Sequence, residues 1–387
     1  MEPAALDSVA FAFTGDANDV STFSGTIYHA LSAAKELELP VRGLKLDVTA
    51  PGCRRRRILW NVVQLLTKGR RGGYQYSNDF LERLWAQDPP ESGETLVNFF
   101  QLYPRSVIEG HNGPKLFYID QTLRQLFETY SEAKLLPEQF KAELIARETE
   151  QYQCATGVIA QSGWAATDVI ESYGVKASRV SSVICGPNLS TATLARWDQE
   201  ALPPSQKAYG SALRLVFVGK DFERKGLRRL TEALSIARAS GANAELVVIG
   251  PEKSSLPEEI AFADGLQFEG FVDKRNEEFR FVNLVSSCDL GCLLSHAEAG
   301  GMSLLEFRRL GLPTIAPHVG GAPEYVVPEA SKLFQPDAPV DQIADTIVEL
   351  SSDPEMLHKM KMAAWSARLS ATWQAAVTEI WSKFESA

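Results

Sequence analysis

The sequence has few cysteines and no long apolar run. Its five cysteines are odd in number and scattered, and Cys288 and Cys292 lie within an apolar segment, so we expect buried, reduced thiols. The five histidines show no zinc-binding spacing, and no metal site is expected. No stretch approaches the roughly 18 apolar residues of a transmembrane helix, and the N-terminus lacks a signal-peptide pattern, which predicts a cytoplasmic protein.

The chain also lacks an excess of positive charge. It has 39 lysines and arginines against 49 acidic residues, a net charge of -10, which argues against general nucleic-acid binding. Its 387 residues are 45% hydrophobic and 23% charged, as in globular proteins. This length suits two domains, each with its own core.

The segment from Ser295 to Val326 has the pattern of a strand end, a glycine loop, a helix and a second strand. Gly300 and Gly301 remove two side chains just before the helix, so backbone amides at its start are open to an anion. Glu298 in the loop and Glu306 about one turn into the helix can reach either side of such an anion, and carboxylates accept hydroxyl hydrogen bonds well.

A competing interpretation makes this pattern purely structural. Ser303 and Glu306 also have the spacing of a capping box, in which Glu306 only reaches back to a free backbone amide.

A second glycine loop follows the strand predicted at Leu213 to Val218. It reads Gly-Lys-Asp-Phe-Glu-Arg-Lys-Gly and contains Lys220 and Lys225, the strand, glycine and basic-loop order of nucleotide sites. Alone, either lysine would be ordinary solvated surface, but beside the first motif phosphate contact is favoured. From here on strands alternate with helices, which predicts a parallel doubly wound sheet with ligands at the C-terminal strand ends.

The first half of the chain opens with the same kind of unit. A strand at Val9 to Thr14 precedes a loop and a helix at whose start lie Ser24, Gly25 and Thr26; an ordinary helix turn is the alternative. Asp120 ends another predicted strand, where sites of α/β proteins collect. Residues 189–210 show little periodicity and are predicted to link the domains.

Taken together, the Glu-x7-Glu spacing, the double glycine within it, Gly311-Leu312-Pro313 and the Gly-Gly-Ala-Pro-Glu at 320–324 resemble the donor-site block of retaining glycosyltransferases of family 4. The similarity extends more weakly over nearly the whole chain. It implies the α/β fold called GT-B, two Rossmann-like doubly wound domains facing a central cleft. Residues 1–200 with a crossing helix at 368–387 would bind the acceptor, and residues 205–367 the nucleotide sugar.

The resemblance also implies roles for individual residues. Glu306 would hold the ribose hydroxyls and Glu298 those of the donor sugar; Lys225 matches a phosphate-binding lysine, whereas Lys220 stands where arginine is usual. Asp120 stands near the place of a histidine found in many members, so that histidine's role is not transferred. The implied sets are Glu298, Lys225 and Lys220 for catalysis, Gly219, Gly250, Phe271, Val272, Gly300, Gly301, Met302, Ser303 and Glu306 for donor binding, and Ser24, Gly25, Thr26 and Asp120 for the cleft and acceptor.

The implied activity is transfer of a sugar from a nucleotide diphosphate sugar to a hydroxyl of a glycan or lipid, with retention of configuration and no cofactor. The chain contains no Asp-x-Asp, which fits a mechanism without a metal. Two alternatives stay open: a sugar-nucleotide epimerase of the same fold, and a sugar-nucleotide-binding or scaffold protein without catalysis. A dehydrogenase is disfavoured because neither half shows Gly-x-Gly-x-x-Gly after its first strand.

The segment from Arg54 to Arg71 combines four consecutive arginines with apolar residues at helical spacing. It is either a basic amphipathic helix that docks on anionic lipid headgroups, at about 1 kcal/mol per basic residue near the surface, or a solvated basic face over a helix buried against the sheet. Some family 4 enzymes with lipid acceptors carry such a helix.

Overall fold

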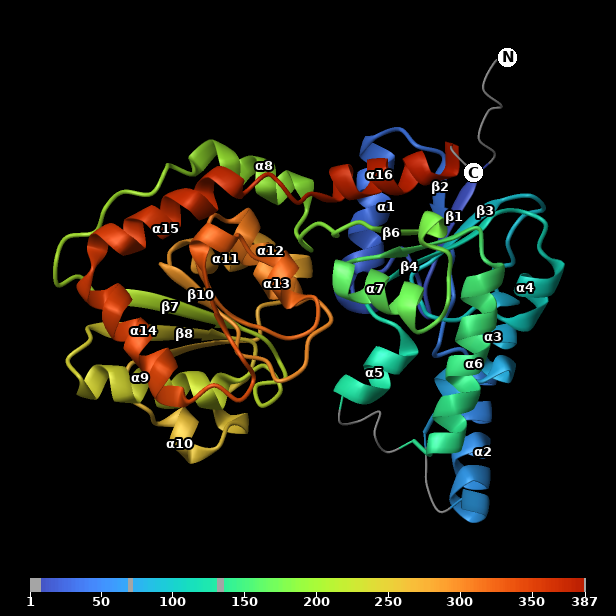
Figure 1. The fold of residues 1–387 in the computed structure, drawn as a ribbon, viewed down its shortest axis with the longest axis horizontal. Coiled ribbons are helices and arrows are strands. Elements are labelled where there is room, and N and C mark those ends of the chain that lie inside the picture. Colours follow the sequence, from blue (N-terminus) through green and yellow to red (C-terminus); the bar gives the residue numbers. More distant parts are fainter. Residues whose placement is uncertain (1–7, 69–71, 131–135, 386–387) are drawn as a thin grey trace. The chain divides into compact units, whose positions relative to one another are not determined.

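The computed structural model describes residues 8–68, 72–130 and 136–385. The chain forms two compact units: unit 1 comprises Met1–Gly186 and Trp373–Ala387, and unit 2 comprises Pro187–Thr372. Within the described residues, each unit contains one six-stranded parallel sheet with helices on both faces (Figure 1).

The sheet of unit 1 has the strand order β2-β1-β3-β4-β5-β6. Its inner strands are buried because both faces of the sheet are covered, as in β1, where all four residues are buried, whereas the edge strands β2 and β6 are more exposed. The strands are β1 Val9–Ala12, β2 Val41–Gly43, β3 Thr95–Asn98, β4 Lys115–Ile119, β5 Gly157–Ala160 and β6 Val180–Ser182, and the helices are α1 Thr26–Glu36, α2 Pro51–Lys68, α3 Asn78–Trp85, α4 Arg105–Gly110, α5 Leu123–Thr129, α6 Glu138–Cys154, α7 Gly163–Glu171 and α16 Trp373–Glu385.

The last helix, α16, belongs to unit 1 and packs against α1. Gln374 donates a hydrogen bond of 2.7 Å to Glu36 at the end of α1. The buried Trp373 begins α16, and Gly186 lies so close to it that a Cβ on Gly186 would be 2.3 Å from the Trp373 backbone nitrogen. The chain therefore returns to the unit in which it began.

The sheet of unit 2 has the order β12-β11-β10-β7-β8-β9. The direction of winding changes between β7 and β10, and in open α/β sheets ligands bind at the C-terminal strand ends beside such a switch point. The strands are β7 Leu213–Val218, β8 Ala244–Ile249, β9 Leu266–Gly270, β10 Leu290–Cys292, β11 Thr314–Pro317 and β12 Ser331–Phe334, and the helices are α8 Thr191–Glu200, α9 Leu227–Ala239, α10 Glu258–Ala261, α11 Lys274–Ser286, α12 Met302–Arg309, α13 Ala322–Tyr325, α14 Val340–Ser352 and α15 Pro354–Ala367.

Part of the expected linker is helical. The helix α8 occupies Thr191–Glu200 and belongs to unit 2. Arg309 of α12 pairs with Asp198 at 3.1 Å, and the Ser190 amide donates to Glu278 of α11 at 2.8 Å. These ties hold α8 on unit 2, so the absence of apolar periodicity did not mean an absence of structure.

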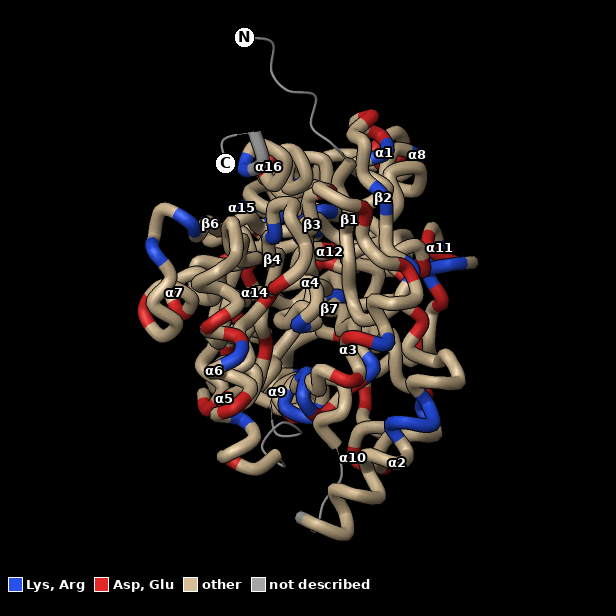
Figure 2. The backbone as a smooth tube through the Cα atoms, turned by 90° about the vertical axis from the view of Figure 1, so that its right-hand side faces the viewer, with Lys and Arg blue, Asp and Glu red and all other residues tan. Residues whose placement is uncertain are grey.

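Helix α2 presents an apolar surface to solvent, which contradicts the interpretation that this side is buried against the sheet. The apolar side chains concerned are 43% to 80% exposed: Ile58, Leu59, Val62, Val63, Leu65 and Leu66. Arg54 to Arg57 are exposed as well, and Figure 2 shows this basic stretch on α2 followed by a stretch without charge. Residues 69–71, which include the last two arginines of the predicted basic segment, lie outside the described residues.

The structure leaves all five cysteines unpaired. The prediction that they are buried is confirmed for four of them and is wrong for Cys154, which is exposed. Among the residues described, no helix has both the length and the apolarity needed to span a bilayer. Within the same ranges, no three histidine, cysteine or acidic side chains are grouped closely enough to hold a metal ion.

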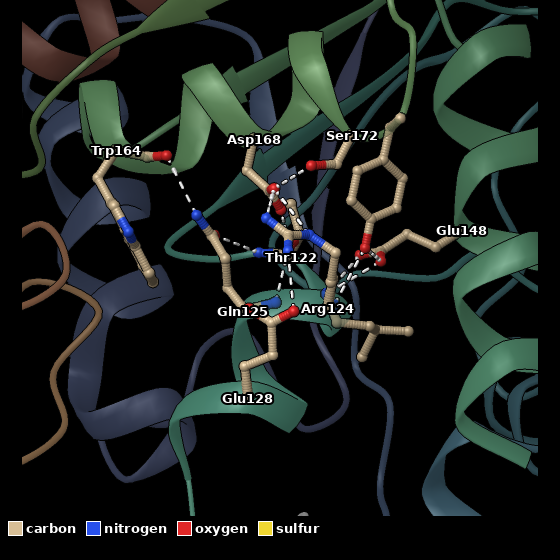
Figure 3. A network of polar contacts seen from close by, with 10 residues as sticks. Thr122, Arg124, Gln125, Glu128, Glu148, Trp164, Asp168 and Ser172 are labelled. Carbon is tan, nitrogen blue, oxygen red and sulfur yellow. Dashed lines mark hydrogen bonds and ion pairs between the residues drawn. The ribbon is translucent and has the colours of Figure 1, made fainter. Parts of the chain in front are cut away.

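A polar network that is buried at Thr122, Glu148 and Asp168 fixes the loop between β4 and α5, where Asp120 lies (Figure 3). Thr122 caps α5 and its hydroxyl donates to Asp168 at 2.6 Å. The Glu148 carboxylate of α6 accepts a hydrogen bond of 2.9 Å from the Leu123 amide at the start of α5, and it also binds Tyr152 and Tyr173.

Burial raises the pKa of Glu148 from 4.5 to about 8, although its hydrogen bonds favour the charged form. A carboxyl group whose pKa is raised by folding binds its proton more tightly in the folded state. Its contribution to the free energy of unfolding is fully present below the pKa of the unfolded state and is lost as pH rises through the pKa of the folded state. We expect the free energy of unfolding of unit 1 to fall from about pH 5 to pH 8 more steeply in the native protein than in Glu148→Gln. One proton bound only in the folded state gives a difference in slope of at most about 1.4 kcal/mol per pH unit. Urea denaturation of both proteins between pH 5 and pH 8 measures this difference in slope.

The matched control is Glu128→Gln, since Glu128 pairs with Arg124 in the same network but is exposed. It should leave the slope unchanged. Equal slopes in the native protein and Glu148→Gln would show that Glu148 does not titrate there.

Candidate nucleotide site in unit 2

The loops after β7 and β10 lie side by side at the switch point of the unit 2 sheet. The backbone amides of Leu294 and His296 donate to the carbonyl oxygens of Lys225 and Arg224, at 3.2 and 3.1 Å. Gly226 makes this contact possible, because its φ is 79° and a Cβ there would lie 2.3 Å from the Leu294 oxygen. The two motifs that the sequence places far apart therefore form one surface.

Glu298 is held in this surface by two side chains. Its Oε1 accepts a hydrogen bond of 2.9 Å from the Ser295 hydroxyl and lies 3.2 Å from Nη1 of Arg224. The Glu298 side chain is 8% exposed. Arg224 also donates to the carbonyl of Ala297 at 2.9 Å and pairs with Asp221 at 3.1 Å. The sequence interpretation missed Arg224; its place beside Lys225 was the only signal.

Lys225 and Lys220 take different positions in the first loop. Lys225 runs past Gly219, where a Cβ would lie 2.2 Å from its Cδ, so glycine leaves the path that this side chain uses. The Lys220 ammonium instead lies 3.9 Å from the ring centroid of Phe271, a cation–π contact with a ring that is 46% exposed. Gly250, with φ 127°, packs against this loop, and a Cβ at this position would lie 2.5 Å from the Gly219 carbonyl oxygen.

The backbone after β9 carries a contact that the sequence did not indicate. Phe271 and Val272 were expected to bring their backbone to a nucleobase, but the Phe271 amide donates to the Glu252 carboxylate at 3.1 Å. Val272 is buried. Glu252 thus lies at the place expected for the base.

The start of α12 has no side-chain cap. Its N-cap is Gly301 with φ 94°, and Gly300 is required because a Cβ there would lie 2.2 Å from the Tyr325 ring. Ser303, on the first turn after Met302, is buried, and its hydroxyl has no hydrogen-bond partner among the described residues. The capping box is therefore not formed, and an unpartnered buried hydroxyl accompanies the positive end of the helix.

Glu306 binds a lysine instead of a backbone amide. Its side chain is 3% exposed, and its Oε1 forms an ion pair with the Lys274 ammonium at the start of α11. Among the residues that the structure describes, none gives a hydrogen bond to Oε2 of Glu306. Sequence reasoning did not single out Lys274.

The predicted cleft residues lie in unit 1. Ser24 has φ 57° and Phe23 has φ 49°, left-handed values that are uncommon outside glycine, and Gly25 and Thr26 continue the turn into α1. Phe23 is held by stacking on Phe13 at 4.5 Å. Strained residues of this kind gather at functional loops, where the surrounding structure maintains them.

Residues 198–366 match the family profile described as Glycosyl transferases group 1. Over 157 residues the chain is 29% identical to a GDP-mannose-dependent monoacylated alpha-(1-6)-phosphatidylinositol monomannoside mannosyltransferase of Corynebacterium glutamicum, covering 39% of this chain and 40% of that relative. The chain thus spans less than half the length of that curated relative.

Solved structures of similar fold cover nearly the whole chain. Sucrose-phosphate synthase from Thermosynechococcus elongatus superposes with a TM-score of 0.70 at 15% identity, covering 98% of each chain. Anabaena HepE in complex with UDP and glucose gives a TM-score of 0.62 at 14% identity, covering 98% of this chain and 100% of that one. The chain has the GT-B fold. In GT-B terms, the site described above lies in the second Rossmann-like unit, within the matched segment.

Proposed function

We propose that this protein is a glycosyltransferase of family 4 that moves a hexose from a nucleotide diphosphate sugar to a hydroxyl acceptor with retention of configuration. The observation that carries the proposal is the uncapped start of α12, with Glu298 in the loop before it and Glu306 one turn further on; the backbone of Lys225 is bonded to that same loop at Leu294. The names of the matched family and relatives support it.

The proposed mechanism is electrostatic. As the bond between the sugar and the diphosphate breaks, negative charge grows on the leaving phosphate, next to the α12 amides and the Lys225 ammonium, with Lys220 further along the same loop. Fixed backbone amides and nearby ammonium groups stabilise such charge with little reorganisation. Glu298 holds the donor sugar, the acceptor oxygen attacks from the leaving-group side, and its proton passes to the departing phosphate.

We assign the two substrates to different units. Unit 2 binds the nucleotide sugar, and unit 1 binds the acceptor through the turn at Ser24 to Thr26 and through Asp120. In unit 1 the left-handed turn and the network that fixes the β4–α5 loop support this assignment.

Incubation with uridine, guanosine and adenosine diphosphate sugars, followed by assay of released nucleoside diphosphate, tests the activity. We expect release from at least one donor, and we expect it to persist in excess chelator, since no step needs a divalent metal or another cofactor. Strict dependence on Mn²⁺ or Mg²⁺ would overturn the charge-stabilisation scheme. Nucleotide binding without any release would favour a sugar-nucleotide-binding protein that has no catalytic activity.

The exposed surface of α2 supports an acceptor at a lipid surface. Four exposed arginines beside six exposed apolar side chains suit insertion at an anionic headgroup layer, although the whole chain is acidic. The mannosyltransferase relative is named for a phosphatidylinositol acceptor. We therefore propose peripheral membrane contact through Arg54 to Arg71.

Replacing Arg54 to Arg57 by serine is expected to weaken binding to phosphatidylserine vesicles, at about 1 kcal/mol per arginine removed, and binding of the native protein should fall with salt. Sedimentation with vesicles measures both. A matched variant, Ile58, Leu59 and Val62 to serine, tests the apolar part separately. If the native protein ignores these vesicles at low salt, a soluble acceptor replaces the lipid one.

A further inference from the structure

An ion pair between Glu306, in the middle of α12, and Lys274, at the start of α11, joins these two helices of unit 2. Asp273 fixes the start of α11, because its side chain caps this helix by accepting a hydrogen bond of 3.1 Å from the Arg275 amide. The Lys274 ammonium also lies 4.3 Å from the ring centroid of Phe281, one side of which therefore supports it. The ammonium is thus held between a ring and a carboxylate.

The burial of the two partners is unequal. The Glu306 side chain is 3% exposed, whereas that of Lys274 is 28% exposed. A carboxylate this deep requires a compensating partner, and removing that partner leaves an uncompensated charge. The ion pair therefore stabilises the buried Glu306 carboxylate more than it stabilises the partly exposed Lys274 ammonium.

We propose that Lys274 is a positioning residue that presents Glu306 to the ribose of the donor nucleotide, and that the pair selects ribonucleotides against 2′-deoxyribonucleotides. The inference rests on the proposed function, since it assumes that a nucleotide occupies the α12 start.

The geometry leaves the carboxylate usable while it is paired. A carboxylate accepts about four hydrogen bonds over its two oxygens, and Lys274 takes Oε1. Oε2 receives none from the described residues, so it remains for a ribose hydroxyl. Because the ammonium fixes Oε1, it also limits rotation of the carboxylate and thereby sets the direction in which Oε2 accepts.

The test compares binding of UDP, GDP and ADP with binding of their 2′-deoxy counterparts by calorimetric titration. We expect the native protein to bind the ribonucleotide about tenfold or more tightly than its 2′-deoxy counterpart, because the deoxynucleotide loses one charged hydrogen bond. Lys274→Met should reduce that preference to near unity, whereas Lys274→Arg should keep most of it. Lys332→Met is the matched control, because it removes a lysine from the Lys332–Glu349 pair on the surface of the same unit.

The outcomes separate this inference from the proposed function. If the native protein binds none of the three diphosphates, both are overturned. If it binds one but Lys274→Met keeps the native preference and only melts earlier, Lys274 is merely a tie between helices and this inference alone fails. Should Lys274→Met not fold, Lys274→Gln, which keeps a donor without the charge, gives the same comparison.

Discussion

Replacement of Lys225 by alanine is expected to lower kcat by on the order of a hundredfold or more. The backbone of Lys225 is bonded to the loop that precedes α12. In the proposed mechanism its ammonium faces the leaving phosphate, which gains charge as the bond breaks, so its contribution is larger in the transition state than in the bound donor. KM for the donor should change less than kcat. Steady-state rates of nucleoside diphosphate release measure both constants.

The control for this variant is Lys332→Ala, which removes the same charge from the surface pair with Glu349. It should leave kcat unchanged. Lys225→Arg keeps the charge and should recover part of the rate, although the longer side chain must pass Gly219. A kcat for Lys225→Ala equal to that of the control would remove Lys225 from the mechanism.

Glu306→Gln is expected to weaken nucleoside diphosphate binding by one to two orders of magnitude. The amide keeps the shape and can still accept a hydrogen bond, but it loses charged hydrogen bonds worth about 1.5 to 3 kcal/mol each, and about 1.4 kcal/mol corresponds to a tenfold change. Calorimetric titration of the variant with the diphosphate that binds the native protein measures the change.

A thermal melt separates this ligand role from a structural one. The structure shows no capping box, so loss of a helix cap is not expected, and the Lys274 ammonium that loses its partner is partly exposed. Glu349→Gln, in the surface pair with Lys332, is the matched control. If Glu306→Gln binds nucleotide like the native protein and only melts earlier, its role at the ribose must be abandoned.

The parts of the fold that local pattern determines could be predicted from the sequence. The strand expected at Leu213–Val218 coincides with β7, the strand expected from Val9 to Thr14 begins with β1, and the strand expected to end at Asp120 is β4. They are parallel strands covered on both faces, so each contains a continuous apolar run, at 215–218, 9–12 and 116–119. The glycines before α12 were recognisable for a similar reason, since only glycine fits the close approach of Tyr325 and the left-handed turn.

The partners of the site carboxylates could not be predicted in this way. Arg224 reaches Glu298, and Lys274 reaches Glu306, across loops that are distant in sequence, and no periodicity records such a pairing. The exposure of α2 was likewise open, because an amphipathic pattern predicts a helix but does not say what covers its apolar side. These features depend on how elements pack, which a single sequence does not state.

A crystal structure of the protein with the nucleoside diphosphate it releases would show whether the start of α12 binds the donor. We expect the diphosphate within hydrogen-bond distance of the backbone amides at Met302 and Ser303 and near the Lys225 ammonium, with a ribose hydroxyl on Oε2 of Glu306. A nucleotide bound away from the start of α12, or bound there with its ribose turned from Glu306, would contradict this expectation.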